Sequence, residues 1–302
     1  ISIGLVGSEM CIRDRLMQEV LKVPTDKYQQ KPENKLSGFD MHNLKHVSVS
    51  QVNKFREAPD AWLAQYLGKQ RFPFGAPAVQ GKAVEGGVDH GVYNDATDEE
   101  CVDLAWSLFK NEIIKIPDGG EEFVKRKGTI EQMVKVALEQ MRPLGKPELP
   151  PRGSAQHRIE INIRFEHGAG GRVKNLGYLD YWYPQHDNLV VDLKTTSKAP
   201  SDWSLSHGIQ AAVYEKAVAK LTHKPAKVKF LYALTRKKDP FVWLEMEDSD
   251  YYMGVFKQTI RTMNNVLKTS TSVEDIIRII PHNPDSFYWN GAQDIAQAFF
   301  PK

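Results

Sequence analysis

The chain is poor in cysteine and in long apolar runs. Only Cys11 and Cys101 occur among its 302 residues, too few for a disulfide framework or for a four-thiolate metal or iron–sulfur site. No apolar run approaches the roughly 20 residues that a membrane helix needs. The amino-terminal residues also lack the charged-then-apolar order of a signal peptide. These absences favour a protein of a reducing, cytoplasmic compartment with no membrane partner.

The chain also has no large excess of positive or negative charge. Lys and Arg total 40 and Asp and Glu total 38, which gives a formal net charge of +2. The chain therefore has no global basic field of the kind that attracts nucleic acid, and any phosphate-binding surface must be local. A hydrophobic content of 41% over this length is enough to bury a substantial core.

The amino-terminal segment carries few folding signals. Residues 1–15, ISIGLVGSEMCIRDR, resemble a translated sequencing-adaptor sequence, so we exclude them from fold reasoning and expect a native start near Met17. Residues 16–46 are polar and interrupted by prolines, which predicts a flexible lead-in. We expect a single domain over residues 47–302.

Helical patterns fill the first part of that domain, over 47–150. A serine start signal and apolar spacing predict two short helices within 48–67 that meet at Pro59. Residues 71–77 are predicted to form a loop. Further amphipathic helices are predicted at about 79–94, 98–115 and 120–141, before a proline-rich loop at 143–151.

The pattern changes to alternation in the second part, over 151–302. RIEINIRF at 158–165, GYLDYWY and LVVDLKTT predict a three-strand meander. A helix at 204–221, strands within 227–236 and 241–246, and a long helix at about 249–268 follow. The order predicts a mixed α/β (α+β) fold, with a central mixed sheet in an αβββαβ core flanked by amino-terminal helices and a carboxyl-terminal helix.

Three ionisable side chains stand out on two of these strands. Asp192 and Lys194 are two residues apart, so they project from the same face of an otherwise apolar strand. Asp180 lies among large apolar residues in the preceding strand, and a hairpin would bring it opposite Asp192. Buried charges must be paired or bind a metal, and converging carboxylates favour Mg²⁺ or Mn²⁺. A lysine beside such a cation can orient or deprotonate water or stabilise charge on a phosphate, which predicts phosphodiester cleavage.

This order of motifs, a strand with Asp, a strand with Asp-x-Lys and a helix with Gln and Tyr, resembles the PD-(D/E)XK nuclease superfamily. The resemblance spans about residues 48–295 and is to the RecB-like and lambda-exonuclease-like branch. It implies that Asp180 and Asp192 bind the metal together with the Leu193 carbonyl, and that Lys194 is the catalytic lysine.

Residues on three helices extend the resemblance. Gln210 and Tyr214 share one helix face at i and i+4, and the family pattern implies that they meet the substrate backbone or support the lysine. Where members of the family carry a helical Gly-x-x-x-His metal ligand, GKAVE places Glu85, with His90 as a fallback ligand. SVSQVNKFREAPDAW resembles the family's Ser-x-Ser helix, so Ser50 is expected to contact substrate.

The iron–sulfur subgroup of the family is disfavoured. Ala58 precedes Pro59 where that subgroup has a cluster cysteine, and the segment HNPDSFYWNGAQ contains no cysteine. The resemblance therefore implies a cluster-free enzyme of phage type.

Several of these residues also have structural explanations. An Asp-x-Lys on a strand is usually an exposed ion pair, a helical glutamate such as Glu85 is usually solvated, and Gln210 and Tyr214 would fit ordinary helix packing. Glu160 faces away from the apolar side of its strand, where it would lie near the metal or pair with a lysine.

Residues and resemblance together predict a magnesium-dependent deoxyribonuclease. The expected type is a phage double-strand exonuclease used in recombination and repair, acting on DNA with a free end in the host cytoplasm. By resemblance, such enzymes often work with a single-strand annealing protein and some form homo-oligomeric rings. Two alternatives stay open: an endonuclease of the same superfamily, and an inactive DNA-binding protein that has kept the fold.

Overall fold

The computed structural model describes residues 36–116, 119–154, 156–164 and 172–301. The expected non-native start and most of the expected lead-in lie outside this part of the chain. The described elements are α2 (Gly38–Met41), β1 (His46–Val47), α3 (Val49–Glu57), α4 (Pro59–Tyr66), α5 (Ala76–Asn94), α6 (Asp98–Ile113), α7 (Gly119–Met141), η2 (Arg142–Leu144), β2 (His157–Arg164), β3 (Arg172–Leu179), β4 (Tyr181–Tyr183), β5 (Leu189–Thr196), α8 (Leu205–Thr222), β6 (Lys227–Leu234), β7 (Phe241–Glu245), α9 (Ser249–Leu267), α10 (Val273–Ile279), η3 (Phe287–Trp289) and α11 (Gln293–Phe299).

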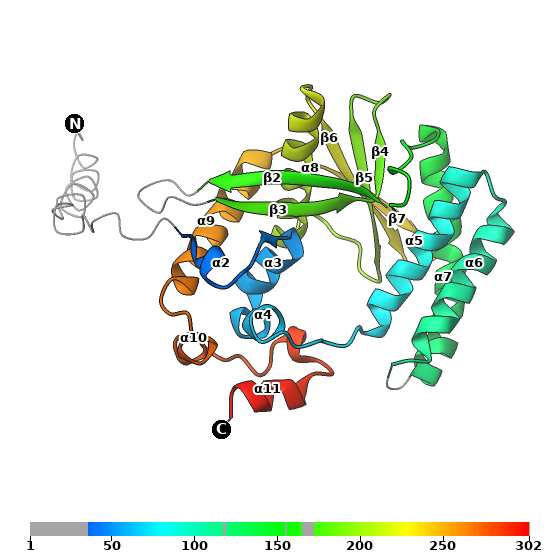
Figure 1. Cartoon of the computed structure of the whole chain (residues 1–302). Helices are drawn as coiled ribbons and strands as arrows, with labels where there is room; N and C mark the ends of the chain where they lie inside the picture. The colour runs from blue at the N-terminus through cyan, green and yellow to red at the C-terminus, as the bar shows by residue number, and fades with distance from the viewer. Residues whose placement is uncertain (1–35, 117–118, 155, 165–171, 302) are drawn as a thin grey trace, which may run out of the picture. The chain divides into compact units, whose positions relative to one another are not determined.

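The strands form two sheets, as Figure 1 shows. In one sheet, in the order β1-β3-β2, β3 pairs parallel with β1 and antiparallel with β2. In the other, in the order β4-β5-β6-β7, β5 and β6 are parallel and both outer pairs are antiparallel. The fold is therefore mixed α/β, as predicted.

The predicted three-strand meander is divided at Asp180. The chain bends there, so β3 pairs with β2 while β4 pairs with β5 in the other sheet. At the bend the Asp180 carboxylate accepts a hydrogen bond from the Leu193 amide. The segment GYLDYWY is thus two strands with an aspartate at the junction.

The second sheet is covered on both faces. Val191 and Leu231 pack against α5, α6 and α7, which lie together on one side of the sheet in Figure 1, whereas Val190 and Phe230 pack toward α8 on the other. This alternation follows from the two-residue period of a strand. Strand β5 is buried from Leu189 to Asp192 and becomes partly exposed over its last four residues, so its carboxyl end opens toward solvent.

Helix formation follows the predicted signals. Ser48 caps α3 through its hydroxyl, and Pro59 stands in the first turn of α4, where a missing amide proton is harmless. The glycines of α5 are explained by close packing: a Cβ at Gly87 would lie 2.6 Å from the Cys101 carbonyl oxygen, and one at Gly91 would lie 2.4 Å from Leu138. Cys101 is therefore part of a buried helical interface.

The prediction of a flexible lead-in is wrong for its last residues, 36–46. Ser37 and Asp40 form a capping box that starts α2, and Phe39 is 1% exposed within the core around α9. The Gly38 amide also donates to the Asn264 side chain at 2.8 Å. A local cap and one buried aromatic ring therefore fix this segment despite its polar composition.

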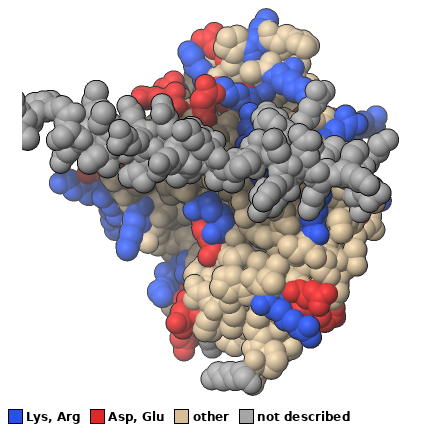
Figure 2. Space-filling view, turned by 90° about the vertical axis from the view of Figure 1, so that its left-hand side faces the viewer, with Lys and Arg blue, Asp and Glu red and all other residues tan. Residues whose placement is uncertain are grey.

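The described surface reflects the balanced composition. On the face that Figure 2 shows, basic and acidic side chains are interspersed among other residues. Within the described residues, every helix is too short or too polar to cross a lipid bilayer.

Candidate active site

The bend at Asp180 places this residue opposite Asp192. Tyr181 pairs with Val191 in the antiparallel ladder of β4 and β5, so the next position brings Asp180 to the level of Asp192. The Leu193 amide donates to Asp180 Oδ2 at 3.2 Å. The proximity expected from a hairpin is therefore present, although Asp180 itself lies between two strands.

Asp192 and Lys194 share one face of β5. The Lys194 ammonium forms an ion pair with Asp192 Oδ1, and the Gln210 side chain donates to Asp192 Oδ2 at 2.8 Å. Asp192 is 0% exposed. Among the described residues, no group donates a well-oriented hydrogen bond to Oδ1, so the ion pair alone compensates the burial of this oxygen.

Helix α8 supports this carboxylate. Its amino terminus is capped by Ser204, and Gln210 and Tyr214 follow on one helix face, one turn apart. The same Gln210 amide nitrogen that reaches Asp192 lies 2.8 Å from the Tyr214 hydroxyl oxygen. Because Tyr214 is 5% exposed, the structure puts both residues behind Asp192 and restricts its orientation.

Glu85 joins the group from α5 through a residue that the sequence did not indicate. The Gln156 side-chain amide donates to Glu85 Oε1 at 2.8 Å and to Asp180 Oδ1 at 3.0 Å. Gln156 precedes β2 in a segment without a motif, so only the three-dimensional structure identifies it. It links two acids that come from different halves of the domain.

The pKa values of the acids reflect burial and mutual repulsion. Burial, followed by the charges of Asp89 and Asp192, raises the pKa of Glu85 to about 7. Burial, followed by the charge of Asp192, raises the pKa of Asp180 well above its usual range, and burial also raises the pKa of Asp192. The three carboxylates therefore resist being ionised together.

Two opposing effects determine the pKa of Lys194. Burial acts to lower the pKa of its ammonium, but the charges of Asp192 and Asp180 outweigh burial, and the net shift is upward. The amine is thus held protonated by the acids around it, and one positive charge faces three potential negative charges.

The donor set suits a hard divalent cation, although the side chains are not arranged around one. Oxygen ligands are those that Mg²⁺ and Mn²⁺ prefer. Among the described residues, no three His, Cys, Asp or Glu side chains already have metal-binding geometry. Carboxylate oxygens of Glu85, Asp180 and Asp192 are instead engaged by Gln156, Gln210 and Lys194. The observation that most favours a cation here is that Asp192 Oδ1 is buried and, among the described residues, is held by the Lys194 ion pair alone.

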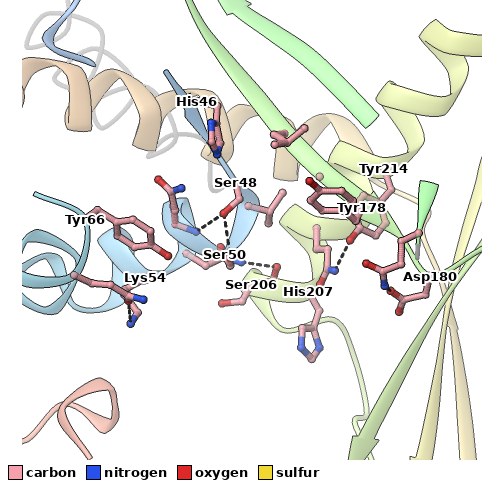
Figure 3. Close-up of a pocket in the computed structure, with 18 of the residues that line it drawn as sticks. His46, Ser48, Ser50, Lys54, Tyr66, Tyr178, Asp180, Ser206, His207 and Tyr214 are labelled. Atoms are coloured by element: carbon pink, nitrogen blue, oxygen red, sulfur yellow. Dashed lines mark hydrogen bonds between the residues drawn. The ribbon is translucent and has the colours of Figure 1, made fainter. Parts of the chain in front are cut away.

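A cleft of about 740 Å³ leads to this group. Figure 3 shows Ser48, Ser50 and Lys54 from the α3 region on one side of the cleft and Asp180 on the other. Gln210 and Tyr214 also line it. Ser50 hydrogen-bonds to Ser48 at 2.8 Å and stays exposed, so the structure brings it to the cleft but not into contact with the acids.

Two further candidates lie apart from the acidic group. Glu160 pairs with Arg158 and with Lys174, the latter at 3.0 Å, on an exposed strand face. The His90 ring nitrogen Nδ1 lies 3.2 Å from the Asn94 amide nitrogen at the end of α5. The contacts described for both residues are those of surface residues.

The structure also identifies an acid that sequence analysis missed. Asp89 lies one helical turn after Glu85 on α5, and burial raises its pKa to about 6. The spacing Glu85-x-x-x-Asp89 was visible in the sequence, but it is as common on solvated helices. Asp89 adds negative charge next to Glu85.

Comparisons with known proteins bear on the fold and on the family of the chain. The chain resembles a solved structure from Eubacterium rectale that bears the name of an exonuclease, with 15% identity and a TM-score of 0.51 over 80% of this chain and 86% of the other. At this identity the likeness concerns the fold. SSO0001 (12% identity, TM-score 0.31, 71% and 86% covered) and Rai1 of Scheffersomyces stipitis (11%, 0.23, 83% and 76%) are more distant. Comparison with curated proteins gave no match.

A family model covers most of the described domain. The model of the PD-(D/E)XK nuclease superfamily matches residues 46–283, which include both sheets and all of the acidic group. We conclude that the chain belongs to the PD-(D/E)XK nuclease superfamily.

Proposed function

We propose that the protein is a magnesium-dependent deoxyribonuclease that hydrolyses phosphodiester bonds. The single observation that carries this proposal is the convergence of Asp180, Asp192 and Glu85 around the ammonium of Lys194 at the end of a polar cleft. An acidic cluster with one amine cannot bind a phosphate unless a cation offsets its charge.

The metal ligands in this proposal are the carboxylates of Asp180, Asp192 and Glu85 and the backbone carbonyl of Leu193. Mn²⁺ could replace Mg²⁺ at such an oxygen site. When bound, the cation would supply charge to the phosphate oxygens and acidify a water. For a cation to bind, the Gln156 amide must give up its hydrogen bonds to the Glu85 and Asp180 carboxylates. Gln156 lines the polar cleft, so its side chain has room to rotate into it.

The remaining residues of the site orient the reacting groups and neutralise charge on the phosphate. Lys194, protonated in the acidic group, aligns the attacking water and offsets negative charge on the phosphate. Gln210 keeps Asp192 in one rotamer by donating to Oδ2, and Tyr214 holds Gln210 in turn. This arrangement limits side-chain motion at the reacting centre, which accelerates the reaction by fixing geometry in advance.

The cleft favours a nucleic-acid strand as substrate. Apart from Asp180 its lining residues are neutral or basic, among them Ser50, Asn53, Lys54 and His207. Hydroxyl, amide and ammonium groups of this kind contact the phosphates of a backbone without reading its sequence. The name of the Eubacterium rectale protein supports an exonuclease. We further propose a phage-type double-strand exonuclease of recombination and repair, working with a single-strand annealing protein and as a homo-oligomer.

The proposal is tested by incubating linear and closed circular duplex DNA with the purified protein, each with magnesium or with a chelator. We expect the linear DNA to be degraded only with magnesium and the circle to persist. Cleavage of the circle would identify an endonuclease. An inactive DNA-binding protein would bind both DNAs and cut neither. Parallel reactions with the Asp192→Asn variant would exclude a contaminating nuclease.

A further inference from the structure

A second polar pocket lies at the carboxyl end of the strand that carries Asp192 and Lys194. It has a volume of about 510 Å³ and lies between α5, α7 and the ends of β5 and β6. Its lining residues are Pro77, Gln80, Lys125, Arg126, Thr129, Met133, Thr195, Thr196, Ser197 and Thr235. We refer to it as the α7 pocket.

The α7 pocket has the chemistry of an anion site. Its lining contains four threonines, one serine and two cationic side chains, and no Asp or Glu. A third pocket, near the start of α6, makes a useful contrast. There the acids Asp95 and Asp98 belong to the lining itself and pair with Lys146 and Arg142, one acid to each cation. Hydroxyl and cationic donors without a competing acid in the lining favour phosphate oxygens in the α7 pocket.

One wall of this pocket is preorganised. Arg126 donates to Glu122 and to the Gln80 side-chain oxygen, and its side chain is 21% exposed. Gln80 is 3% exposed and donates from its nitrogen to the Thr129 hydroxyl at 3.2 Å. These contacts fix the Arg126 guanidinium but use only some of its N–H donors. Lys125 stands beside it, with its side chain 72% exposed and its ammonium 3.4 Å from a Glu122 oxygen. Two cations therefore share the single acid Glu122, which leaves one positive charge in excess.

The α7 pocket lies next to the reacting centre, because two of its lining residues directly follow Lys194 on β5. Thr195 and Thr196 directly follow Lys194 on β5, and a strand advances roughly 3.3 Å per residue. Thr196 shares the strand face of Lys194, whereas Thr195 faces α5, where a Cβ at Gly81 would lie 3.3 Å from its hydroxyl. The cleft reaches Asp180 from the α3 side, and the α7 pocket begins just past Lys194 on the α7 side.

We propose that the α7 pocket binds backbone phosphates of the cleaved DNA strand, on the opposite side of the scissile bond from the cleft. This inference rests on the proposed nuclease function and adds a second substrate contact to it. Lys125 and Arg126 supply the charge, and the Thr195 hydroxyl supplies a neutral donor. The Thr196 hydroxyl already donates to the Lys198 carbonyl. The strand crosses the acidic group between two pockets whose linings contain no Asp or Glu apart from Asp180.

The first test measures DNA binding without cleavage. Binding of a fluorescent duplex with a single-stranded end is followed by anisotropy in chelator over a range of salt concentrations, for the parent and for the Lys125→Ala, Arg126→Met double variant. We expect the double variant to bind about tenfold more weakly, with a salt slope smaller by about one to two. Lys127→Ala is the matched control, because Lys127 lies on the same helix but its ammonium sits over the Trp106 ring.

The second test locates the contact along the DNA. A neutral methylphosphonate replaces one phosphate at a time on either side of the cleaved bond. The parent should lose affinity at one or two positions on one side, and the double variant should lose nothing further at those positions, because both changes remove the same interaction. Additive losses at every position would overturn the proposal.

The outcomes separate this inference from the nuclease function. If the parent cleaves DNA and the double variant binds as the Lys127→Ala control does, the α7 pocket is not a substrate site and the nuclease function stands. If the parent neither binds nor cleaves DNA, the proposed function itself fails. Should Arg126→Met disturb folding, Lys125→Ala alone decides the matter, since Lys125 is exposed; an unchanged salt slope in that variant would count against the proposal.

Discussion

Two regions of the domain each bury an aspartate completely, and they treat it differently. Asp60, in α4, is 0% exposed, and it accepts hydrogen bonds from the Ala61 and Asn283 amides and from the Trp289 indole, with the His282 ring at 2.8 Å. Asp192 is equally buried, but it has one neutral donor, Gln210, and one ion pair, with Lys194.

The difference separates a structural carboxylate from a functional one. The donors around Asp60 come from α4 and from the segment before α11, so this acid joins two distant parts of the chain and needs no further partner. Asp192 instead faces Asp180 and Glu85, whose charges oppose one another. A buried acid surrounded by donors stabilises the fold, whereas buried acids that converge create a demand for a cation.

The largest expected effect comes from removing the charge at Asp192. Asp192→Asn keeps the shape and the contact with Gln210 but weakens the metal site, so we expect magnesium-dependent cleavage to fall about a thousandfold, equivalent to roughly 4 kcal/mol. The melting temperature in chelator should fall only modestly, because Asp180 and Glu85 still face the Lys194 ammonium after its ion pair with Asp192 is lost. Initial cleavage rates and thermal melts measure the two quantities; near-parental cleavage would mean that Asp192 is not a metal ligand.

Removing the carboxylate of Asp60 should have the opposite profile. Asp60→Ala leaves several buried donors without an acceptor, and we expect a loss of about 3 kcal/mol in unfolding free energy. Cleavage by the folded protein at low temperature should keep its magnesium dependence. Asp103→Ala, at an exposed position of α6, is the control. A variant of Asp60 that is fully stable yet inactive would reverse the roles of the two aspartates.

Most of the secondary structure, and the strands that carry the acids, could be predicted from the sequence. Periodicity located α5 to α9 and the strands β2, β5, β6 and β7, because both long helices and alternating strands leave local signals. The segment GYLDYWY, predicted as one strand, covers the end of β3 and all of β4. The division into two sheets at Asp180 could not be predicted, since the bend depends on a side-chain hydrogen bond to Leu193, thirteen residues away. Gly87 and Gly91 likewise made sense only once α6 and α7 were in contact with α5.

The candidate site was predictable where its residues share a strand or a helix face. Asp192 with Lys194, and Gln210 with Tyr214, follow directly from strand and helix periods. Gln156 could not be found in this way, because it lies outside any periodic segment and touches residues 24 and 71 positions away. Glu160, as an acid, is a more obvious candidate for a metal site than Gln156. It lies four residues after Gln156, however, which is roughly 13 Å along a strand.

An intermediate effect is expected at Glu85, and it depends on pH. Burial raises the pKa of Glu85 in the native state to about 7 from an ordinary value of 4.5. The native protein therefore holds a proton that the unfolded chain releases between these values. The stability that this group contributes is present below about pH 4.5 and is lost as the pH rises toward 7.

Glu85→Gln should remove that dependence. In chelator at about pH 8 we expect the variant to be about 1–2 kcal/mol more stable than the parent, with little difference near pH 5. Added magnesium should raise the melting temperature of the parent more than that of the variant. Glu139→Gln, on the exposed side of α7, is the control. Equal stabilisation of parent and variant by magnesium would remove Glu85 from the proposed metal site.

The smallest effect is expected at Glu160, which represents a third environment for an acid. Its carboxylate is partly exposed and pairs with Arg158 and Lys174, and the hydrogen bond from Lys174 lowers its pKa. Solvent screens such a pair, so Glu160→Gln should shift the melting temperature by about a degree or less and change cleavage by less than about twofold. Lys174→Met, which removes the other partner, should behave in the same way. If Glu160→Gln instead abolished magnesium-dependent cleavage while the protein stayed folded, the metal would have to lie on the exposed face of β2, and the contrast between Asp60 and Asp192 would no longer identify the active site.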